Sequence, residues 1–124
     1  MNVVAQVFAV VAGILHVAIW VMESVLFSRP TFHRLFRVRP EHVPVVRLWA
    51  VNQGFYNLFL GIGAIGGVMT LHLGDETVGR TLVLFCCACM AAAGVVLVFS
   101  ERRLWRGALV QVVPPLVVLL TSLV

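Results

Sequence analysis

Two side chains in the first apolar run of the sequence can exchange a proton, the imidazole of His16 and the carboxyl of Glu23. Together with Trp20 they lie at positions i, i+4 and i+7, so a helix places all three on one face. A charged side chain costs about 2.5–3.5 kcal/mol at the centre of a membrane helix. We therefore expect this face to point toward protein or a water-filled cavity, where Glu23 and His16 are candidates for a catalytic proton relay.

A second set of polar and aromatic side chains lies close together in the run that begins near residue 45. Four of them fall within an arc of about 100° on a helix, and a fifth lies at its edge. They are Trp49, Asn52, Gln53, Tyr56 and Asn57. Counting at about 1.5 Å per residue from one shared surface puts Glu23 near the level of Trp49 and Asn52. His16 then lies deeper, level with Tyr56 and Asn57.

The two stripes are expected to face one another and to form a pocket between their helices. Gln111, in the last apolar run, reaches a similar depth, and Pro114 and Pro115 after it could kink that helix. The side chains assigned to ligand binding are Trp20, Trp49, Asn52, Gln53, Tyr56, Asn57 and Gln111. The alternative for the amides is that they only hydrogen-bond between helices, as Asn and Gln often do in membranes.

The composition excludes a water-soluble enzyme. Of the 124 residues 61% are hydrophobic and 11% are charged, and a soluble domain typically has about twice that charged share. A chain this short cannot bury so much apolar surface in its own core. Four runs reach the roughly 20 apolar residues that span a bilayer: residues 3–27, 45–71, 79–99 and 104–124. We predict one all-α domain, residues 1–124, a polytopic membrane protein built as a bundle of four transmembrane helices.

The basic residues predict the orientation of these spans. All nine are arginines, and eight flank the first and third connections: Arg29, Arg34, Arg37, Arg39, Arg47, Arg102, Arg103 and Arg106. Only Arg80 lies near the second connection, beside Asp75 and Glu76. The positive-inside rule assigns the arginine-rich side to the cytoplasm, so both termini should face outward. The same confinement to short gaps argues against a nucleic-acid surface.

The first connection is the longest and contains a short amphipathic segment. Pro30 can begin a helix, and Phe32, Leu35 and Phe36 then repeat at helical spacing. We predict that this segment lies in the inner headgroup layer and contacts membrane lipids; recognition of a specific anionic lipid is the sharper alternative. The remaining histidines are expected to be solvated: His33, His42 and His72.

No metal site is expected. Cys86, Cys87 and Cys89 lie among alanines and a glycine in one apolar run, and a metal would need further ligands. We interpret them as small residues for close helix packing. Glycines 61, 63, 66 and 67 likewise predict close contact, and Gly63 and Gly67 have GxxxG spacing.

The run Ala50–Leu60 resembles the Asn-Gln-Gly-x-Tyr-Asn signature of the small bacterial membrane proteins grouped as "domain of unknown function 1304". His16, Glu23, the loop rich in Phe and Arg, and the four-span length are also similar to that family. The resemblance covers essentially the whole chain. It implies a four-helix integral membrane protein of the bacterial plasma membrane, and it implies no particular reaction.

These features favour a protein that binds or acts on a small lipophilic molecule, such as a quinone-, isoprenoid- or sterol-like lipid. They leave open whether it is an enzyme or a carrier, which reaction it performs, and whether it uses a cofactor. One alternative is a structural or accessory subunit that docks its small-residue faces on a larger membrane complex. Another is a small transporter, for which four helices would require a homo-oligomer such as a dimer.

Overall fold

The computed structural model describes residues 1–123, and it is 88% helix without a strand in that part of the chain. Four of its helical segments are long and apolar enough to cross a membrane, so the predicted all-α class with four long apolar helices is confirmed. The segments are α1 (Val3–Trp20), extended by the π-helical turn η1 (Val21–Val25), α3 (Val43–Leu73), α4 (Glu76–Ser100) and α5 (Trp105–Thr121). The short helix α2 (Pro30–Leu35) and the 3-10 turns η2 (Pro40–His42) and η3 (Arg102–Leu104) lie between them.

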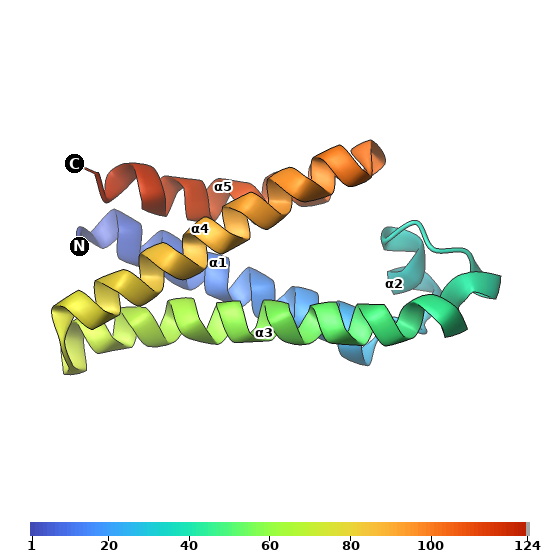
Figure 1. Ribbon diagram of the computed structural model, residues 1–124, viewed down its shortest axis with the longest axis horizontal. Coiled ribbons are helices and arrows are strands. Elements are labelled where there is room, and N and C mark those ends of the chain that lie inside the picture. Colours follow the sequence, from blue (N-terminus) through green and yellow to red (C-terminus); the bar gives the residue numbers. More distant parts are fainter. Residues whose placement is uncertain (124) are drawn as a thin grey trace.

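The four long helices form an up-and-down ring. α1 contacts α3 and α5, and α4 contacts the same two helices, whereas α1 and α4 scarcely touch. The N- and C-termini lie at one end and α2 at the other, and α4 and α5 diverge from α1 and α3 toward the α2 end (Figure 1). This divergence leaves space inside the bundle at that end.

Glycines and alanines make the closest helix contacts. The position that a Cβ would take on Gly61 lies 2.7 Å from the carbonyl oxygen of Gly13, and on Gly67 it lies 3.0 Å from the carbonyl oxygen of Gly79. Such close approach is expected where dispersion contacts, and not exclusion of water, hold helices together. The prediction of close contact is wrong for Gly66, because a Cβ there would meet nothing within 4 Å. This residue lies on the side of α3 that faces away from Gly61.

α2 confirms the predicted helical segment, with Pro30 in its first turn. It ends in a Schellman motif, since the amide of Val38 donates to the carbonyl of His33 and that of Arg37 to Arg34. Arg37 occupies the left-handed position of the motif, with φ 62°. Glycine is usual there, and a residue with a Cβ costs roughly 1–2 kcal/mol.

The prediction that His33 is solvated is wrong. His33 is only 3% exposed, and its Nδ1 lies 2.9 Å from the carbonyl oxygen of Val38. The left-handed turn at Arg37 folds the chain back, so that the Val38 carbonyl covers the imidazole. His42 and His72 are exposed, as predicted.

Polar contacts close the end of the bundle that holds the termini. The side chain of Asn2 caps α1 by accepting from the amide of Ala5, and its Nδ2 donates to the carbonyl of Thr121 over 2.6 Å. Arg80 of α4 donates to the carbonyl of Ser122 over 3.0 Å. The free volume of the bundle is therefore at the α2 end.

Candidate functional site

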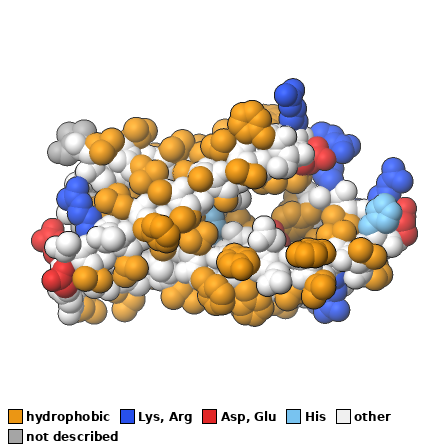
Figure 2. Space-filling view, in the orientation of Figure 1, with side chains coloured by type: hydrophobic (Ala, Val, Ile, Leu, Met, Phe, Trp, Pro, Cys, Tyr) orange, Lys and Arg blue, Asp and Glu red, His pale blue; other side chains and the backbone are white. Residues whose placement is uncertain are grey.

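A cavity of about 510 Å³ lies between the helices at the α2 end. All four long helices and residues 35–37 at the end of α2 contribute to its wall, and Figure 2 shows the hollow between α3 and α4. We call it the α2 cavity. Its apolar wall includes Leu15, Ile19, Met22, Phe36, Ala93, Leu97 and Val110. Its polar wall consists of Glu23, Gln53, Asn57 and Gln111, with Arg37, Arg103 and Arg106.

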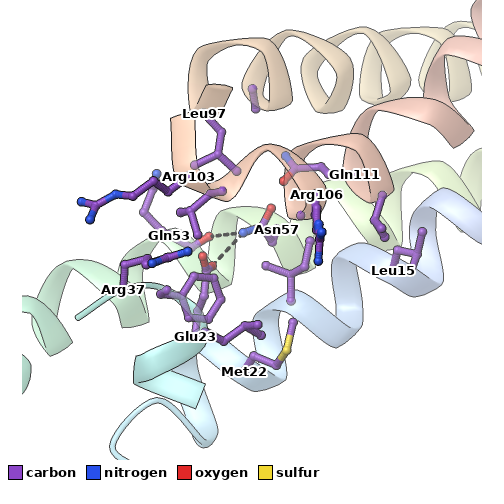
Figure 3. Close-up of a pocket in the computed structure, with 17 residues that line it drawn as sticks. Leu15, Met22, Glu23, Arg37, Gln53, Asn57, Leu97, Arg103, Arg106 and Gln111 are labelled. Atoms are coloured by element: carbon purple, nitrogen blue, oxygen red, sulfur yellow. Dashed lines mark hydrogen bonds between the residues drawn. The ribbon is translucent and has the colours of Figure 1, made fainter. Parts of the chain in front are cut away.

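A hydrogen bond between α1's extension and α3 is the centre of the polar wall. Nδ2 of Asn57 donates to Oε2 of Glu23 over 2.8 Å and also to the backbone carbonyl of Gln53 over 3.1 Å. Both bonds are drawn in Figure 3, where Gln111 of α5 lies across the cavity. One carboxyl oxygen of Glu23 is thus fixed, and the carboxyl group faces a space large enough for a small molecule.

The local backbone explains the position of Glu23. Residues 21–25 form a π-helical turn, closed by a bond of 2.9 Å from the amide of Leu26 to the carbonyl of Val21. Ser24 anchors this turn to α3 by donating to the carbonyl of Val51 over 3.0 Å. Gly54 makes the approach possible, because a Cβ there would overlap the Ser24 hydroxyl. Single π turns of this kind are frequent at functional sites.

The structure brings four of the nine predicted site residues into one cavity. They come from three helical segments far apart in the sequence, namely Glu23, Gln53, Asn57 and Gln111. The other five do not line it: His16, Trp20, Trp49, Asn52 and Tyr56.

Trp49, Asn52 and Tyr56 were predicted to point inward, but they lie on the outer surface of α3. Trp49 is 68% exposed and Tyr56 is 63% exposed. The face of α3 that packs on α1 is instead its small-residue face, with Gly54 and Gly61. Small residues permit the close backbone contact that stabilises helix pairs in lipid, whereas Trp and Tyr suit the outer boundary between water and hydrocarbon.

The contacts between η1 and α3 agree with the predicted level of Glu23 near Asn52. Ser24 donates to the carbonyl of Val51, and the Cβ of Glu23 lies 3.1 Å from the position that a Cβ would take on Gly54. From this level the side chain of Glu23 reaches further along α3, to the side chain of Asn57.

His16 is buried in the bundle, with 0% exposure, and is not part of the cavity wall. Its Nδ1 lies 2.8 Å from the carbonyl of Ala12 and must be the donor, because a carbonyl only accepts. Seven residues separate it from Glu23, or about 10 Å along a helix. The structure therefore does not bring the two together as a direct proton relay.

Trp20 packs its ring edge-to-face on Phe55, with centroids 5.9 Å apart. Its Nε1 and the Nε2 of His16 are buried without a hydrogen-bond partner in residues 1–123. These two groups belong to the contact between α1 and its neighbours and not to the wall of the α2 cavity.

Three arginines of the cavity were read from the sequence only as markers of orientation. Arg37 lies in the left-handed turn after α2, Arg103 in η3 and Arg106 in the first turn of α5. Arg103 is held by a bidentate ion pair with Glu101, at 2.9 and 3.0 Å. Hydrogen bonds from Arg103 lower the pKa of the Glu101 carboxyl to about 2, so that carboxyl is ionised at neutral pH. No pattern in the sequence marked these three arginines as cavity residues, because the left-handed turn at Arg37 is a feature of the folded backbone.

The cavity thus combines an apolar wall, one carboxyl, three side-chain amides and a cationic rim. The carboxyl of Glu23 can accept or donate a hydrogen bond or a proton, according to its protonation state. The amides of Gln53, Asn57 and Gln111 can orient hydroxyl or carbonyl groups. Such a mixture of apolar walls with few polar groups is typical of sites for small molecules.

The fold and the site define an all-helical protein with four helices long and apolar enough to cross a membrane and with a cavity of apolar and polar walls near one end of its bundle. The chain belongs to the family described as "Protein of unknown function (DUF1304)", whose model matches residues 10–123. This confirms the resemblance seen in the sequence. No curated protein and no solved structure matches the chain.

Proposed function

We propose that this protein is an integral membrane protein of the bacterial plasma membrane that binds or acts on a small lipophilic molecule in the α2 cavity. The ligand is of the quinone, isoprenoid or sterol type, with an apolar body and few polar groups. The observation that carries the proposal is the cavity of about 510 Å³, in which the Glu23–Asn57 pair faces an otherwise mostly apolar wall.

The size of the cavity supports this choice. Sites that enclose drug-sized molecules have volumes of about 300–1,000 Å³. A polar cluster that served only to hold helices together would need no such space beside it. In the proposed complex the apolar body contacts Leu15, Ile19 and Val110, and a hydroxyl or carbonyl group bonds Glu23 or Gln111.

Filling the cavity should abolish binding without unfolding the protein. Ala93 and Ala92 are neighbours on α4 and both are exposed, but only Ala93 lines the cavity. We expect Ala93→Phe to reduce binding of a photoreactive farnesol analogue at least about tenfold, since the ring occupies the ligand's volume. Labelling of the purified protein in lipid nanodiscs measures this loss.

The matched control is Ala92→Phe, which adds the same ring outside the cavity and should label like the unchanged protein. Equal labelling of both variants, with their helical circular dichroism unchanged, would contradict the proposal. If both variants still bind the probe and the protein co-purifies with a larger assembly, the result would favour the accessory-subunit alternative.

We also propose that both termini lie outside the cytoplasm, because the arginine-rich α2 end is the cytoplasmic one by the positive-inside rule. Alkaline phosphatase fused to the C-terminus should then be active, and fused after Ser28 it should be inactive. Green fluorescent protein at the same two positions should give the opposite pattern. Active phosphatase after Ser28 would reverse the assignment.

A further inference from the structure

We propose that the ligand of the α2 cavity is a single-chain amphiphile with a phosphate head, bound by Arg37 and Arg106 at the cavity's rim. This inference rests on the proposed function and narrows it from a lipophilic molecule to an anionic one. Its basis is that two guanidinium groups without an ion-pair partner line the same apolar cavity.

Arg37 is the first of these groups. Its left-handed backbone, φ 62°, occupies a position where glycine is free of strain. Strained residues of this kind occur preferentially at functional sites. The side chain lines the cavity, on the opposite side of Asn57 from Arg106 in the view of Figure 3. An arginine therefore occupies this turn in spite of the unfavourable backbone conformation, and its guanidinium group lines the cavity.

Arg106 is the second group, and it lies at the start of α5. The N-terminus of α5 is already satisfied: the amide of Trp105 donates to the carbonyl of Arg102, and the Glu101 carboxylate caps the preceding turn η3 by accepting from the amide of Arg103. Gly107 also lines the cavity, and a Cβ there would meet nothing within 4 Å. A phosphate can thus approach the guanidinium of Arg106 along the part of the first turn that has no side chain.

The third arginine is already neutralised. Arg103 forms the bidentate pair with Glu101, and in Figure 3 its side chain extends away from Glu23 and Asn57. In residues 1–123 neither Arg37 nor Arg106 pairs with a carboxylate. The cavity therefore has two cations without a carboxylate ion pair, and its one carboxyl, Glu23, is bonded to Asn57. The Arg106 guanidinium also lies 5.3 Å from the centre of the Trp105 ring, and, beside the hydrogen bonds from Arg103, the charge of Arg37 contributes to the lowered pKa of Glu101.

The head group and the chain follow from these contacts. Guanidinium groups bind phosphate through paired hydrogen bonds, which makes arginine the preferred residue for that anion. The apolar wall formed by Ile19, Leu97 and Val110 then receives the chain. A volume of about 510 Å³ suits one head and one chain segment, the size of a drug-like ligand.

Two probes with the same chain test the head group. Farnesyl phosphate and farnesol differ only in the phosphate, and their binding to the full-length protein in neutral-lipid nanodiscs can be measured by competition with the photoreactive farnesol analogue. We expect farnesyl phosphate to bind at least about tenfold more tightly, as for a hydrogen-bonded charge pair. Inorganic phosphate alone should compete only weakly, because it lacks the chain.

Three variants locate the phosphate. Arg37→Gly removes the cation and relieves the backbone, so it should fold at least as well as the unchanged protein. Arg37→Gly and Arg106→Gln should each reduce the preference for farnesyl phosphate about tenfold while farnesol binding changes little. Arg39→Gln is the control, since Arg39 is exposed on the same side but does not line the cavity.

The outcomes separate this inference from the proposed function. Equal binding of both probes, blocked by Ala93→Phe, would overturn the phosphate head and leave the lipophilic site intact. Equal loss in Arg39→Gln and Arg37→Gly would show general surface attraction and would also overturn it. Full competition by inorganic phosphate would indicate a free-anion site instead of an amphiphile. Failure of every probe to bind would overturn both proposals.

Discussion

Gly61→Ala is expected to destabilise the bundle by about 1–3 kcal/mol or more, the usual cost of forcing extra atoms into a packed core. The new methyl group would lie 2.7 Å from the carbonyl oxygen of Gly13 and 3.1 Å from Cγ2 of Val17. The first of these atoms belongs to the backbone of α1 and cannot rotate away. Relief therefore requires α1 and α3 to move apart along their contact.

Gly66→Ala is the matched control, in the same helix and with the same change. Its methyl group would meet nothing within 4 Å, so the expected effect is within about 0.5 kcal/mol. Titration with sodium dodecyl sulfate in a mild detergent, followed by circular dichroism, compares the two free energies of unfolding. Equal stability of the two variants would show that the Gly13–Gly61 contact does not determine the packing of α1 on α3.

The effect of Gly61→Ala should extend to the cavity. Gly54 lies two turns away on the same face of α3, and it is the residue that admits Ser24 and the π-helical turn. If α1 and α3 separate, the Glu23–Asn57 bond of 2.8 Å lengthens with them. We therefore expect weaker probe binding in Gly61→Ala than in Gly66→Ala, although neither residue lines the cavity.

The number and type of the long segments could be predicted from the sequence, because runs of about 20 apolar residues leave few other solutions. The amphipathic segment after residue 30 and the convergence of Glu23, Gln53, Asn57 and Gln111 followed from helical spacing and approximate depth. Those predictions needed only the periodicity of a helix. The structure has the predicted helices, and these four side chains line one cavity.

The rotation of α3 could not be predicted with the same argument. The prediction assumes that polar side chains point toward the centre of the bundle, and it therefore places the polar and aromatic arc of α3, centred near Trp49, on the inner face. The contact face is instead set by Gly54 and Gly61, because closeness of approach determines which faces meet in an apolar solvent. Gly61 was identified as a contact residue, but the sequence does not state which of two competing faces prevails.

Two further features depend on local backbone that helical periodicity does not contain. The π-helical turn at residues 21–25 departs from the ideal helix of 3.6 residues per turn that the prediction assumes. The left-handed conformation of Arg37 covers His33 and directs an arginine to the cavity. Both features depend on tertiary contacts, with Ser24 bonded to α3 and Val38 folded back on α2.

Asn57→Leu is the second substitution with a large expected effect. It removes the side-chain donor of Glu23 at 2.8 Å and leaves a partly buried carboxyl group without that bond, which costs about 1–3 kcal/mol. Asn52→Leu is the control, since Asn52 is an exposed amide on the same helix that makes no side-chain hydrogen bond in residues 1–123. It should change the free energy of unfolding by no more than about 0.5 kcal/mol.

The double variant Glu23→Leu/Asn57→Leu decides what the pair is for. Replacing both partners by apolar groups is often nearly neutral for stability, so the double variant should regain most of the stability that Asn57→Leu loses, with a coupling of about 0.5–3 kcal/mol. A loss equal to the sum of the single variants would contradict the direct bond.

Because the restored double variant is folded and keeps the apolar wall, its probe binding then reports on the carboxyl alone. We expect farnesol binding to fall about tenfold, the value of one hydrogen bond to a polar ligand group in a low-dielectric site; unchanged binding would assign the Glu23–Asn57 pair to helix packing only.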